Sequence, residues 1–345
     1  MTVPRRRLPG SSGNALVLAG GGVAGIAWEL GVLCGIADAD PALAGRVLAA
    51  GVVIGTSAGA AVAAQITCGV PLDELYAAQL RPETAEIEVD FDKDKLFADF
   101  GVVIASASGP EDTGRRMGAI ALAATIVDPT ARLAAIDARL PVKHWPDRRV
   151  LVTAVDAETG AVTVFTRESG VTLVDAVAAS SAVPGVWAPV AIGGRSYIDG
   201  GVRSMNNADL AAGADRVLII QPALEGIPQP WGSLDAEIAA LAPAGVYVIS
   251  ADQPSVDAFG TNPLSPTTRA SSARAGRAVG AAHAARVAAL WKVTLTTSRR
   301  RSTACASLVP PVPHGSRCLV HVRDRHNRMP VGGPRTSRQG RTRAP

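Results

Sequence analysis

The segment Gly55-Thr56-Ser57-Ala58-Gly59 decides the fold, because an apolar run at residues 51–54 stops there and a small-residue segment at 58–66 begins. This order predicts a strand, a sharp turn and a helix. At such a turn Ser57 is lifted out of the sheet, and glycines at both ends leave room for a substrate carbonyl. The pattern alone also fits a serine that only caps the helix, so the rest of the chain has to decide.

Length and composition allow one large domain or two ordinary ones. The chain has 345 residues, of which 48% are hydrophobic, enough for a sizeable core. The net charge of +4 is unevenly distributed, since residues 292–345 hold 12 Lys and Arg and one acidic residue. Residues 1–291 therefore sum to −7. This distribution predicts no nucleic-acid surface on the body, and a basic, disordered tail at 292–345.

Cysteine usage and hydropathy indicate the compartment. Four cysteines, at positions 34, 68, 305 and 318, show no paired spacing, which favours free thiols in a reducing compartment. No uninterrupted run of about 20 apolar residues is present, so we expect no membrane span. Arginines 5–7 before apolar residues 15–33 imitate an export signal, but three glycines and Glu29 interrupt the run. We expect a cytoplasmic protein with peripheral membrane contact and a flexible leader at residues 1–14.

Strand and helix patterns alternate along residues 15–291. Buried strands are expected at residues 15–18, 52–54, 217–220 and 246–249, with hairpins at 149–166 and 190–198. Helices are expected at residues 23–39, 58–66, 115–127, 173–180 and 269–291, with a first helical turn at 71–75. Residues 81–148 are less regular and predict a cap or substrate-facing insertion. The alternation favours one α/β domain rather than two folds.

The loop Gly20-Gly21-Gly22-Val23-Ala24-Gly25 follows the first strand and opens a helix. Such a loop presents backbone N–H groups to an anion, either a dinucleotide pyrophosphate or the oxyanion of an ester under attack. Since Gly20, Gly22 and Gly25 satisfy G-x-G-x-x-G, a Rossmann domain is a genuine alternative. A dinucleotide site wants an acidic residue at the end of the second strand, but that strand ends in Thr56-Ser57. The position expected to bind ribose instead carries a candidate nucleophile.

A serine nucleophile needs a base. Only His144 and His283 lie in the body, one in a surface-like link and the other in an ordinary helical context. The body therefore offers no well-placed histidine for a Ser-Asp-His triad. Asp199 ends an apolar strand and precedes Gly200-Gly201, a turn from which a carboxylate can point into a cleft and accept the serine proton. Standing alone, the same motif is an ordinary Asp-Gly turn.

Four pieces now stand in order along the chain: the glycine loop, Gly55-Thr56-Ser57-Ala58-Gly59, Ala179-Ser180-Ser181-Ala182-Val183-Pro184-Gly185, and Asp199-Gly200-Gly201. Together they resemble the patatin-like phospholipase family over roughly residues 14–291. The resemblance implies a three-layer α/β/α sandwich with a central, mostly parallel sheet. It also implies a Ser–Asp dyad, with Ser57 as nucleophile and Asp199 as base, and oxyanion N–H groups from Gly20, Gly21 and Gly22. One departure is Ala24, where family members often carry Arg or Lys, which leaves open how the loop is braced.

The expected function is a lipid acyl hydrolase of the phospholipase A, lysophospholipase or esterase type. We expect it to need no cofactor and no metal, to bind a lipid or ester substrate, and to contact a membrane interface transiently. No nucleic-acid partner is expected. Two alternatives remain at this point: a dinucleotide-binding protein that uses the glycine loop, and a catalytically silent lipid-binding relative.

Overall fold

A mixed, mostly parallel sheet runs through the part of the chain that the computed structural model describes, residues 13–91, 93–124, 128–226 and 233–291. The tail at 292–345 and most of the leader at 1–14 lie outside the described residues, so those two expectations stay predictions. The strands are β1 (Asn14–Leu18), β2 (Val52–Thr56), β3 (Arg149–Asp156), β4 (Val162–Phe165), β5 (Val190–Ile192), β6 (Arg195–Asp199), β7 (Arg216–Leu224) and β8 (Gly245–Ala251). The order is β5-β6-β3-β2-β1-β7-β8, with β4 paired to β3.

The strand pairing puts the ends of β1 and β2 side by side. The pairs β1/β2, β1/β7, β2/β3 and β7/β8 are parallel, whereas β4 and β6 run antiparallel to β3, and β5 antiparallel to β6. Leu18 lies opposite Gly55, so the glycine loop and the serine turn leave the sheet at the same edge. In a parallel sheet this carboxyl edge is where ligands bind. The expected α/β/α sandwich with a mostly parallel sheet is confirmed.

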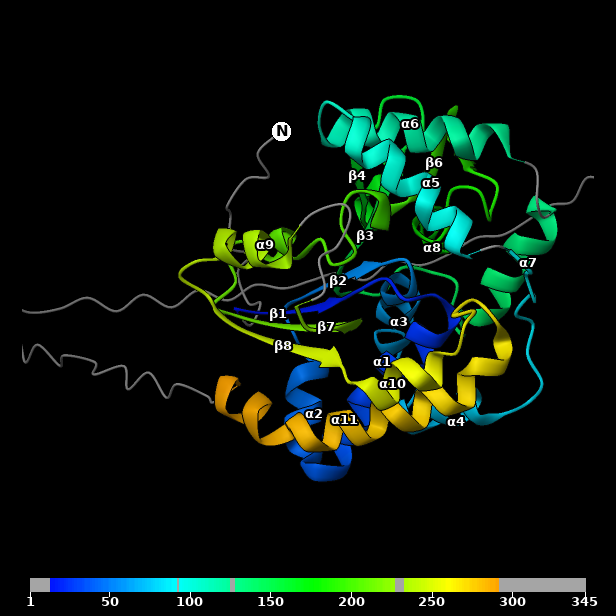
Figure 1. Ribbon diagram of the computed structural model, residues 1–345. Coiled ribbons are helices and arrows are strands. Elements are labelled where there is room, and N and C mark those ends of the chain that lie inside the picture. Colours follow the sequence, from blue (N-terminus) through cyan, green and yellow to red (C-terminus); the bar gives the residue numbers. More distant parts are fainter. Residues whose placement is uncertain (1–12, 92, 125–127, 227–232, 292–345) are drawn as a thin grey trace, which may run out of the picture. The chain divides into compact units, whose positions relative to one another are not determined.

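Helices cover both faces of this sheet (Figure 1). The helices are α1 (Gly22–Ala39), α2 (Pro41–Leu48), α3 (Ala58–Ile66), α4 (Leu72–Leu80), α5 (Lys93–Ser106), α6 (Pro110–Ala123), α7 (Pro129–Arg139), α8 (Leu173–Ser180), α9 (Leu234–Ala240), α10 (Gln253–Phe259) and α11 (Arg269–Leu290). Alternate β1 residues face opposite layers: Leu16 and Leu18 join the core beneath α1, and Ala15 and Val17 join the core beneath α9. The two apolar faces explain why β1 reads as a continuous apolar run.

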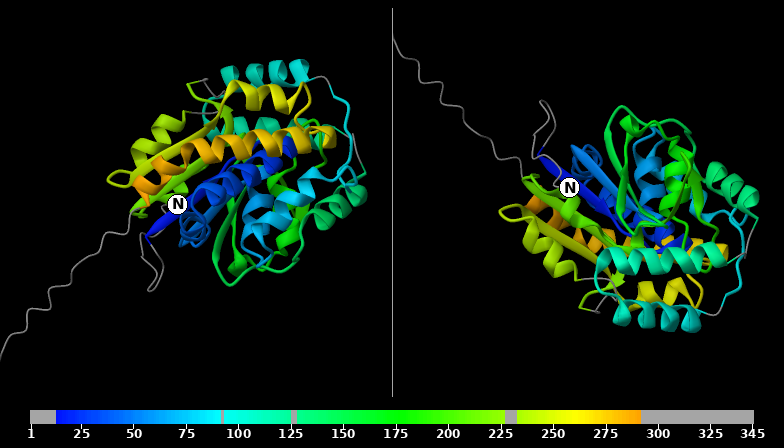
Figure 2. Two further views of the ribbon diagram at one scale, coloured as in Figure 1. Left: turned by 90° about the horizontal axis from the view of Figure 1, so that it is seen from below. Right: turned by 90° about the horizontal axis from the view of Figure 1, so that it is seen from above.

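Helix α1 is buried against α11, and glycines allow the close approach. A Cβ at Gly31 would lie 2.2 Å from the Ala273 carbonyl oxygen, and one at Gly276 would lie 2.1 Å from that of Trp28. Figure 2 shows α11, in orange, along the helical layer that includes α1, in blue. By length and mean hydropathy, 1.4, α1 is apolar enough to cross a membrane, but 78% of it is buried inside the fold. Burial also raises the pKa of Glu29, which favours its neutral form.

The expected elements are largely confirmed, with differences in the less regular region. The helix expected at residues 115–127 begins earlier, at Pro110, because Pro110 followed by Glu111 and Asp112 makes a favourable first turn. It ends at Ala123, and residues 125–127 lie outside the described part. Helices α2, α5, α7 and α10 were not anticipated, whereas α9 lies in the helical sequence expected before the strand at 246–249. For α2 the overlooked signal is Asp40, whose side chain accepts from the Leu43 N–H directly before Pro41.

Candidate active site

Ser57 lies between β2 and α3 in a conformation that non-glycine residues seldom adopt. Its φ is 53° and its ψ is −110°, so the turn stores backbone strain of about 1–3 kcal/mol. The flanking glycines are required sterically. A Cβ at Gly59 would lie 2.0 Å from the Leu18 carbonyl oxygen, and a Cβ at Gly55 would lie 2.5 Å from the Gly59 carbonyl oxygen. The five-residue pattern therefore encodes this turn.

Two serines from the end of α8 hold the turn in place. The Ser57 N–H donates to Ser180 Oγ at 2.9 Å. Ser181 Oγ donates to the Val177 carbonyl at 2.8 Å and lies 3.4 Å from the Ser57 carbonyl oxygen. Both hydroxyls are buried, so these hydrogen bonds are shielded from water. This explains why the segment Ala179-Ser180-Ser181 accompanies the serine turn in the sequence.

Asp199 ends β6, next to β3 in the sheet. Its N–H donates to the Ala182 carbonyl at 2.9 Å, and its Oδ1 accepts from the Gly201 N–H at 2.7 Å. Gly200 packs against the neighbouring strand, because a Cβ there would lie 2.5 Å from the Thr153 carbonyl oxygen. The two glycines thus let the chain turn directly beside β3 and fix the direction of the carboxylate.

The environment of Asp199 gives its carboxyl a pKa of about 6. Burial raises the pKa, while hydrogen bonds from the Gly201 N–H and the Ser57 side chain, and the charge of Arg132, lower it in part. The carboxylate is therefore still ionised at neutral pH but is more basic than an exposed aspartate. This combination suits a group that accepts a proton from a hydroxyl.

The glycine loop is braced by backbone hydrogen bonds from two other segments. The Gly20 N–H donates to the Met205 carbonyl at 2.9 Å, and the Ala24 N–H donates to the Pro263 carbonyl at 2.9 Å. Ala24 is fully buried, so bracing at this position comes from its backbone. Gly20 therefore helps to hold the loop, and its N–H is already engaged. Within the described residues, the N–H groups of Gly21 and Gly22 have no acceptor.

A pocket of about 580 Å³ contains both Ser57 and Asp199. Its floor is formed by the glycine loop, the serine turn and the Asp-Gly-Gly turn. Its roof is formed by apolar side chains of α5 and α6, within the expected cap at residues 81–148. The roof side chains are Leu96, Phe97, Phe100 and Met117. The pocket combines a few polar groups with a mostly apolar lining, which is typical of small-molecule sites.

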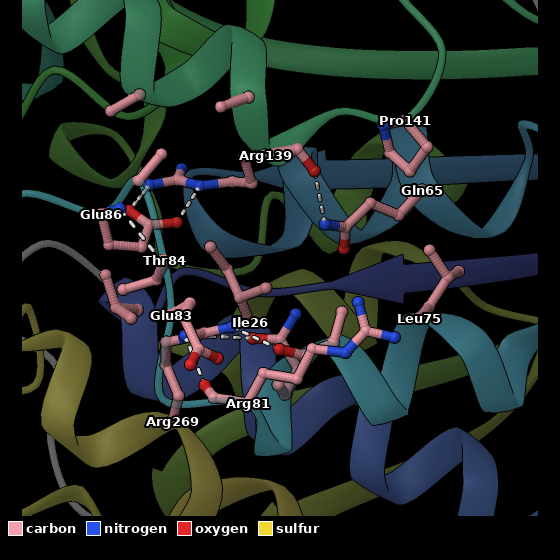
Figure 3. A pocket seen from close by; sticks show the side chains of 16 residues that line it. Ile26, Gln65, Leu75, Arg81, Glu83, Thr84, Glu86, Arg139, Pro141 and Arg269 are labelled. Carbon is pink, nitrogen blue, oxygen red and sulfur yellow. Dashed lines mark hydrogen bonds and ion pairs between the residues drawn. The ribbon is translucent and has the colours of Figure 1, made fainter.

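A second pocket, of about 230 Å³, has several charged side chains in its lining and does not include Ser57 (Figure 3). One wall is the Glu86–Arg139 ion pair, in which Nε and Nη2 of Arg139 donate to the two carboxylate oxygens at 2.7 and 2.6 Å. Burial raises the pKa of Glu86, but Arg139 outweighs this effect and the pKa lies below its usual value. Arg269 donates to the carbonyl groups of Ala78 and Arg81 at the end of α4. Arg139, Glu86 and Arg269 therefore already have hydrogen-bonding partners within the protein.

Asn207, which contacts the residue before Ser57, was not predicted from the sequence. Asn207 has a left-handed backbone, with φ 49°, and its Nδ2 donates to Thr56 Oγ1 at 3.0 Å and to the Ser204 carbonyl at 2.6 Å. Thr56 Oγ1 also lies 2.9 Å from Thr153 Oγ1. Asn207 therefore connects the segment after Asp199 to the strand end before Ser57. Its only sequence signal is an asparagine pair, which is typical of any turn.

Neither histidine of the described residues lines the pocket with Ser57. His283 Nδ1 lies 2.7 Å from the Tyr247 hydroxyl oxygen, between α11 and β8, and burial lowers its pKa. His144 is exposed, in the link before β3. The groups that the fold brings to Ser57 are thus an aspartate and backbone N–H groups.

A comparison with models of protein families identifies one family that matches the chain. A sequence model of the family described as patatin-like phospholipase matches residues 16–212, more than half of the chain. The crystal structure of VipD from Legionella pneumophila aligns over 81% of this chain and 67% of its own, with 12% identity and a TM-score of 0.40. The crystal structure of the type III effector protein ExoU aligns over 81% of this chain and 54% of its own, with 14% identity and a TM-score of 0.37. No match was found among curated proteins.

Proposed function

Because the chain belongs to the patatin-like phospholipase family, and is a lipid hydrolase at the level of that family, we propose that it cleaves carboxylic esters of lipids through an acyl-Ser57 intermediate. The observation that carries this proposal is the meeting of Ser57 and Asp199 in one largely apolar pocket. The strained turn at Ser57 and the basic carboxylate of Asp199 support it further.

In the first half of the proposed reaction, Asp199 accepts the proton of the Ser57 hydroxyl while Ser57 Oγ attacks the ester carbonyl. The tetrahedral oxyanion then collapses, and the bond to the alcohol oxygen breaks. The departing alkoxide takes the proton from Asp199, and the acyl group remains on Ser57. A single carboxylate thus serves as base and then as acid.

In the second half, a water molecule replaces the alcohol. Asp199 accepts one of its protons as the oxygen attacks the acyl carbonyl, and the proton returns to Ser57 Oγ when the acyl bond breaks. The fatty acid leaves and the dyad is restored. No histidine is needed at either step, in keeping with the distance of His283 from this pocket in the fold.

Backbone N–H groups are the proposed donors to the oxyanion. Gly21 and Gly22 are our candidates from the glycine loop, because among the described residues their N–H groups have no acceptor. The N–H of Ala58, the residue directly after the nucleophile, also has no acceptor among the described residues and is the third proposed donor. Gly20 stays in the loop as a bracing residue. Removing one such donor commonly costs about 10²–10³ in rate.

We further propose that α5 approaches a lipid interface. Phe97 lines the pocket and is 47% exposed, and Val102, five residues further along the helix, is 69% exposed. Leu122 of α6 is exposed as well. Apolar side chains at the rim of an apolar pocket allow an acyl chain to pass from a bilayer without crossing water. Contact of this kind is transient and needs no anchoring segment.

Labelling with a fluorophosphonate probe tests the proposed nucleophile. We expect the wild-type protein to react covalently and Ser57→Ala to lose labelling and ester hydrolysis, by about 10³–10⁶-fold in rate. Peptide mapping should find the adduct on Ser57. A wild-type protein that stays unlabelled would favour a silent lipid-binding relative, and tight binding of NAD, FAD or ATP would favour a dinucleotide site.

A further inference from the structure

Arg132, on the first turn of α7, is a charged residue that lies near the catalytic candidates, since its charge interacts with that of Asp199. It lines a small cleft together with Ser57, Gly22 and Ser181. The same cleft is bordered by Glu86 and Arg139, which form its far wall. Its volume is about 20 Å³, which is room for about one water-sized group. A charged side chain therefore lines the same small cleft as Ser57.

The guanidinium of Arg132 is held but not neutralised. Its Cζ lies 4.0 Å from the centroid of the Trp187 ring, a cation–π contact that leaves the edge N–H groups unused. Among the described residues, no hydrogen bond or ion pair satisfies those groups. The one carboxylate in the cleft, Glu86, is already engaged on both oxygens by Arg139. Arg132 therefore offers a free, oriented set of donors.

The charge balance around Arg132 favours an added anion. Burial and, to a lesser extent, the charge of Arg139 lower the pKa of this guanidinium, Glu86 and Asp199 offset this in part, and the resulting pKa is about 9. Arg132 remains charged at neutral pH but is poorly compensated. Guanidinium groups bind phosphate and carboxylate oxygens with charge-assisted hydrogen bonds. An anionic group placed in the cleft would compensate the charge.

The size of the cleft limits how such a group enters. The cleft and the large pocket share Ser57, Gly22, Val183 and Leu264 in their linings. One oxygen of a phosphate or carboxylate fits the cleft, while the rest of the molecule stays in the large pocket. The scissile ester then lies at Ser57, between the acyl chain and the anionic group.

We propose that Arg132 is a specificity-determining residue, which binds an anionic group of the substrate close to the scissile ester. The proposal rests on the esterase function proposed above and adds to it a preference for phosphate-bearing or carboxylate-bearing esters over neutral ones. The residue comes from α7, within the region that the sequence indicated only as a cap.

A matched pair of substrates tests this assignment. A short-chain monoacylglycerol phosphate and the monoacylglycerol with the same acyl chain differ only by the phosphate. We expect wild-type protein to show a kcat/KM about 10- to 100-fold higher for the phosphate ester, and Arg132→Met to remove that preference by losing about 10- to 100-fold more kcat/KM on the phosphate ester than on the neutral ester. Arg132→Lys should keep part of the preference, because it retains charge without the planar fork.

Arg277→Met is the control variant. Arg277 also lies over an aromatic ring, at 4.8 Å from the Tyr76 centroid, but it pairs with Asp38 and lines none of the three pockets described here. Arg277→Met removes a positive charge, as Arg132→Met does, and should leave the substrate preference unchanged. An equal loss on both substrates in Arg132→Met would overturn the proposal, as would an unchanged preference.

Two further measurements keep the outcome decisive. Inorganic phosphate should inhibit neutral-ester hydrolysis competitively in the wild-type protein and more weakly in Arg132→Lys, which serves if Arg132→Met does not fold. Absence of inhibition counts against the proposal. Wild-type protein that takes up the fluorophosphonate and hydrolyses the neutral ester without preferring the phosphate ester contradicts only the role of Arg132. Wild-type protein that does neither overturns the proposed function and this inference with it.

Discussion

The floor of the large pocket consists of backbone turns held by hydrogen bonds, whereas its roof consists of side chains from two helices. On the floor, Ser57 is strained and its N–H is fixed by Ser180 Oγ at 2.9 Å. On the roof, Phe97 and Val102 of α5 project apolar groups toward solvent. A substitution on the floor thus changes the geometry of reacting atoms. A substitution on the roof changes surface and volume, which proteins tolerate better.

After loss of the nucleophile itself, the largest expected effect is on the floor, at Asp199→Asn. Loss of the base should lower kcat/KM by about 10²–10⁴-fold. The free energy of unfolding should instead be higher in Asp199→Asn than in wild type, because the pKa of Asp199 is raised in the folded state. Wild-type stability therefore declines as pH rises from about 4, the pKa in the unfolded state, through about 6, the pKa in the folded state. The stability gain of Asp199→Asn over wild type should therefore be larger at pH 8 than at pH 5, by about 1 kcal/mol. Urea denaturation at both pH values checks this, and an equal gain would contradict the cited pKa.

Ser180→Ala should have the next largest effect. It leaves the buried Ser57 N–H without an acceptor and lets the strained turn relax, so we expect kcat to fall about 10- to 100-fold and stability to fall by about 1–3 kcal/mol. Ser255→Ala is the matched control, since it removes a buried hydroxyl that accepts from Trp28 Nε1 at 2.9 Å, away from the dyad. Steady-state kinetics and thermal unfolding separate the two. If both variants lose stability but keep kcat, the support of the turn by Ser180 is structural only.

The pH dependence of the wild-type protein gives a smaller effect. With the pKa of Asp199 at about 6, kcat/KM for a neutral ester should rise about tenfold from pH 5 to pH 8, with its half-maximal value near pH 6. The active form is the ionised carboxylate, so activity is lost as pH falls. A rate that is flat over this range would argue against Asp199 as the base.

The smallest effect is expected on the roof, at Val102→Ser. This change should lower hydrolysis of lipid in vesicles by about 3- to 10-fold, because one exposed apolar side chain no longer enters the interface, and leave hydrolysis of a soluble ester unchanged. Val162→Ser, on the partly exposed strand β4, is the control for loss of a surface valine. Equal losses in both variants would exclude α5 as the contact surface.

The floor was predictable from the sequence, and the roof was not. Gly55, Gly59 and Gly200 occupy places where a Cβ would lie 2.0–2.5 Å from a backbone atom, so the geometry imposes a visible residue pattern. Helix α5 imposes no such pattern, since its apolar side chains are mixed with small residues and need only fill space.

Single site residues that come from distant segments of the chain were also not predicted from the sequence. Arg132 contacts Trp187, and Asn207 donates to Thr56, in both cases across a long stretch of sequence. No spacing in the sequence marks an isolated arginine or asparagine as part of a site. The resemblance to the family predicted Ser57 and Asp199 because it covers consecutive motifs, whereas Arg132 and Asn207 became visible only once the helices and turns were in place.

The glycine contacts between α1 and α11 can form only late during synthesis of the chain. About 250 residues separate the end of α1 from the end of α11. At about 5–20 residues per second, an emerging chain waits roughly 12–50 s before its first helix meets the partner that covers it. During that interval an apolar segment long enough to cross a bilayer is without its final packing partner.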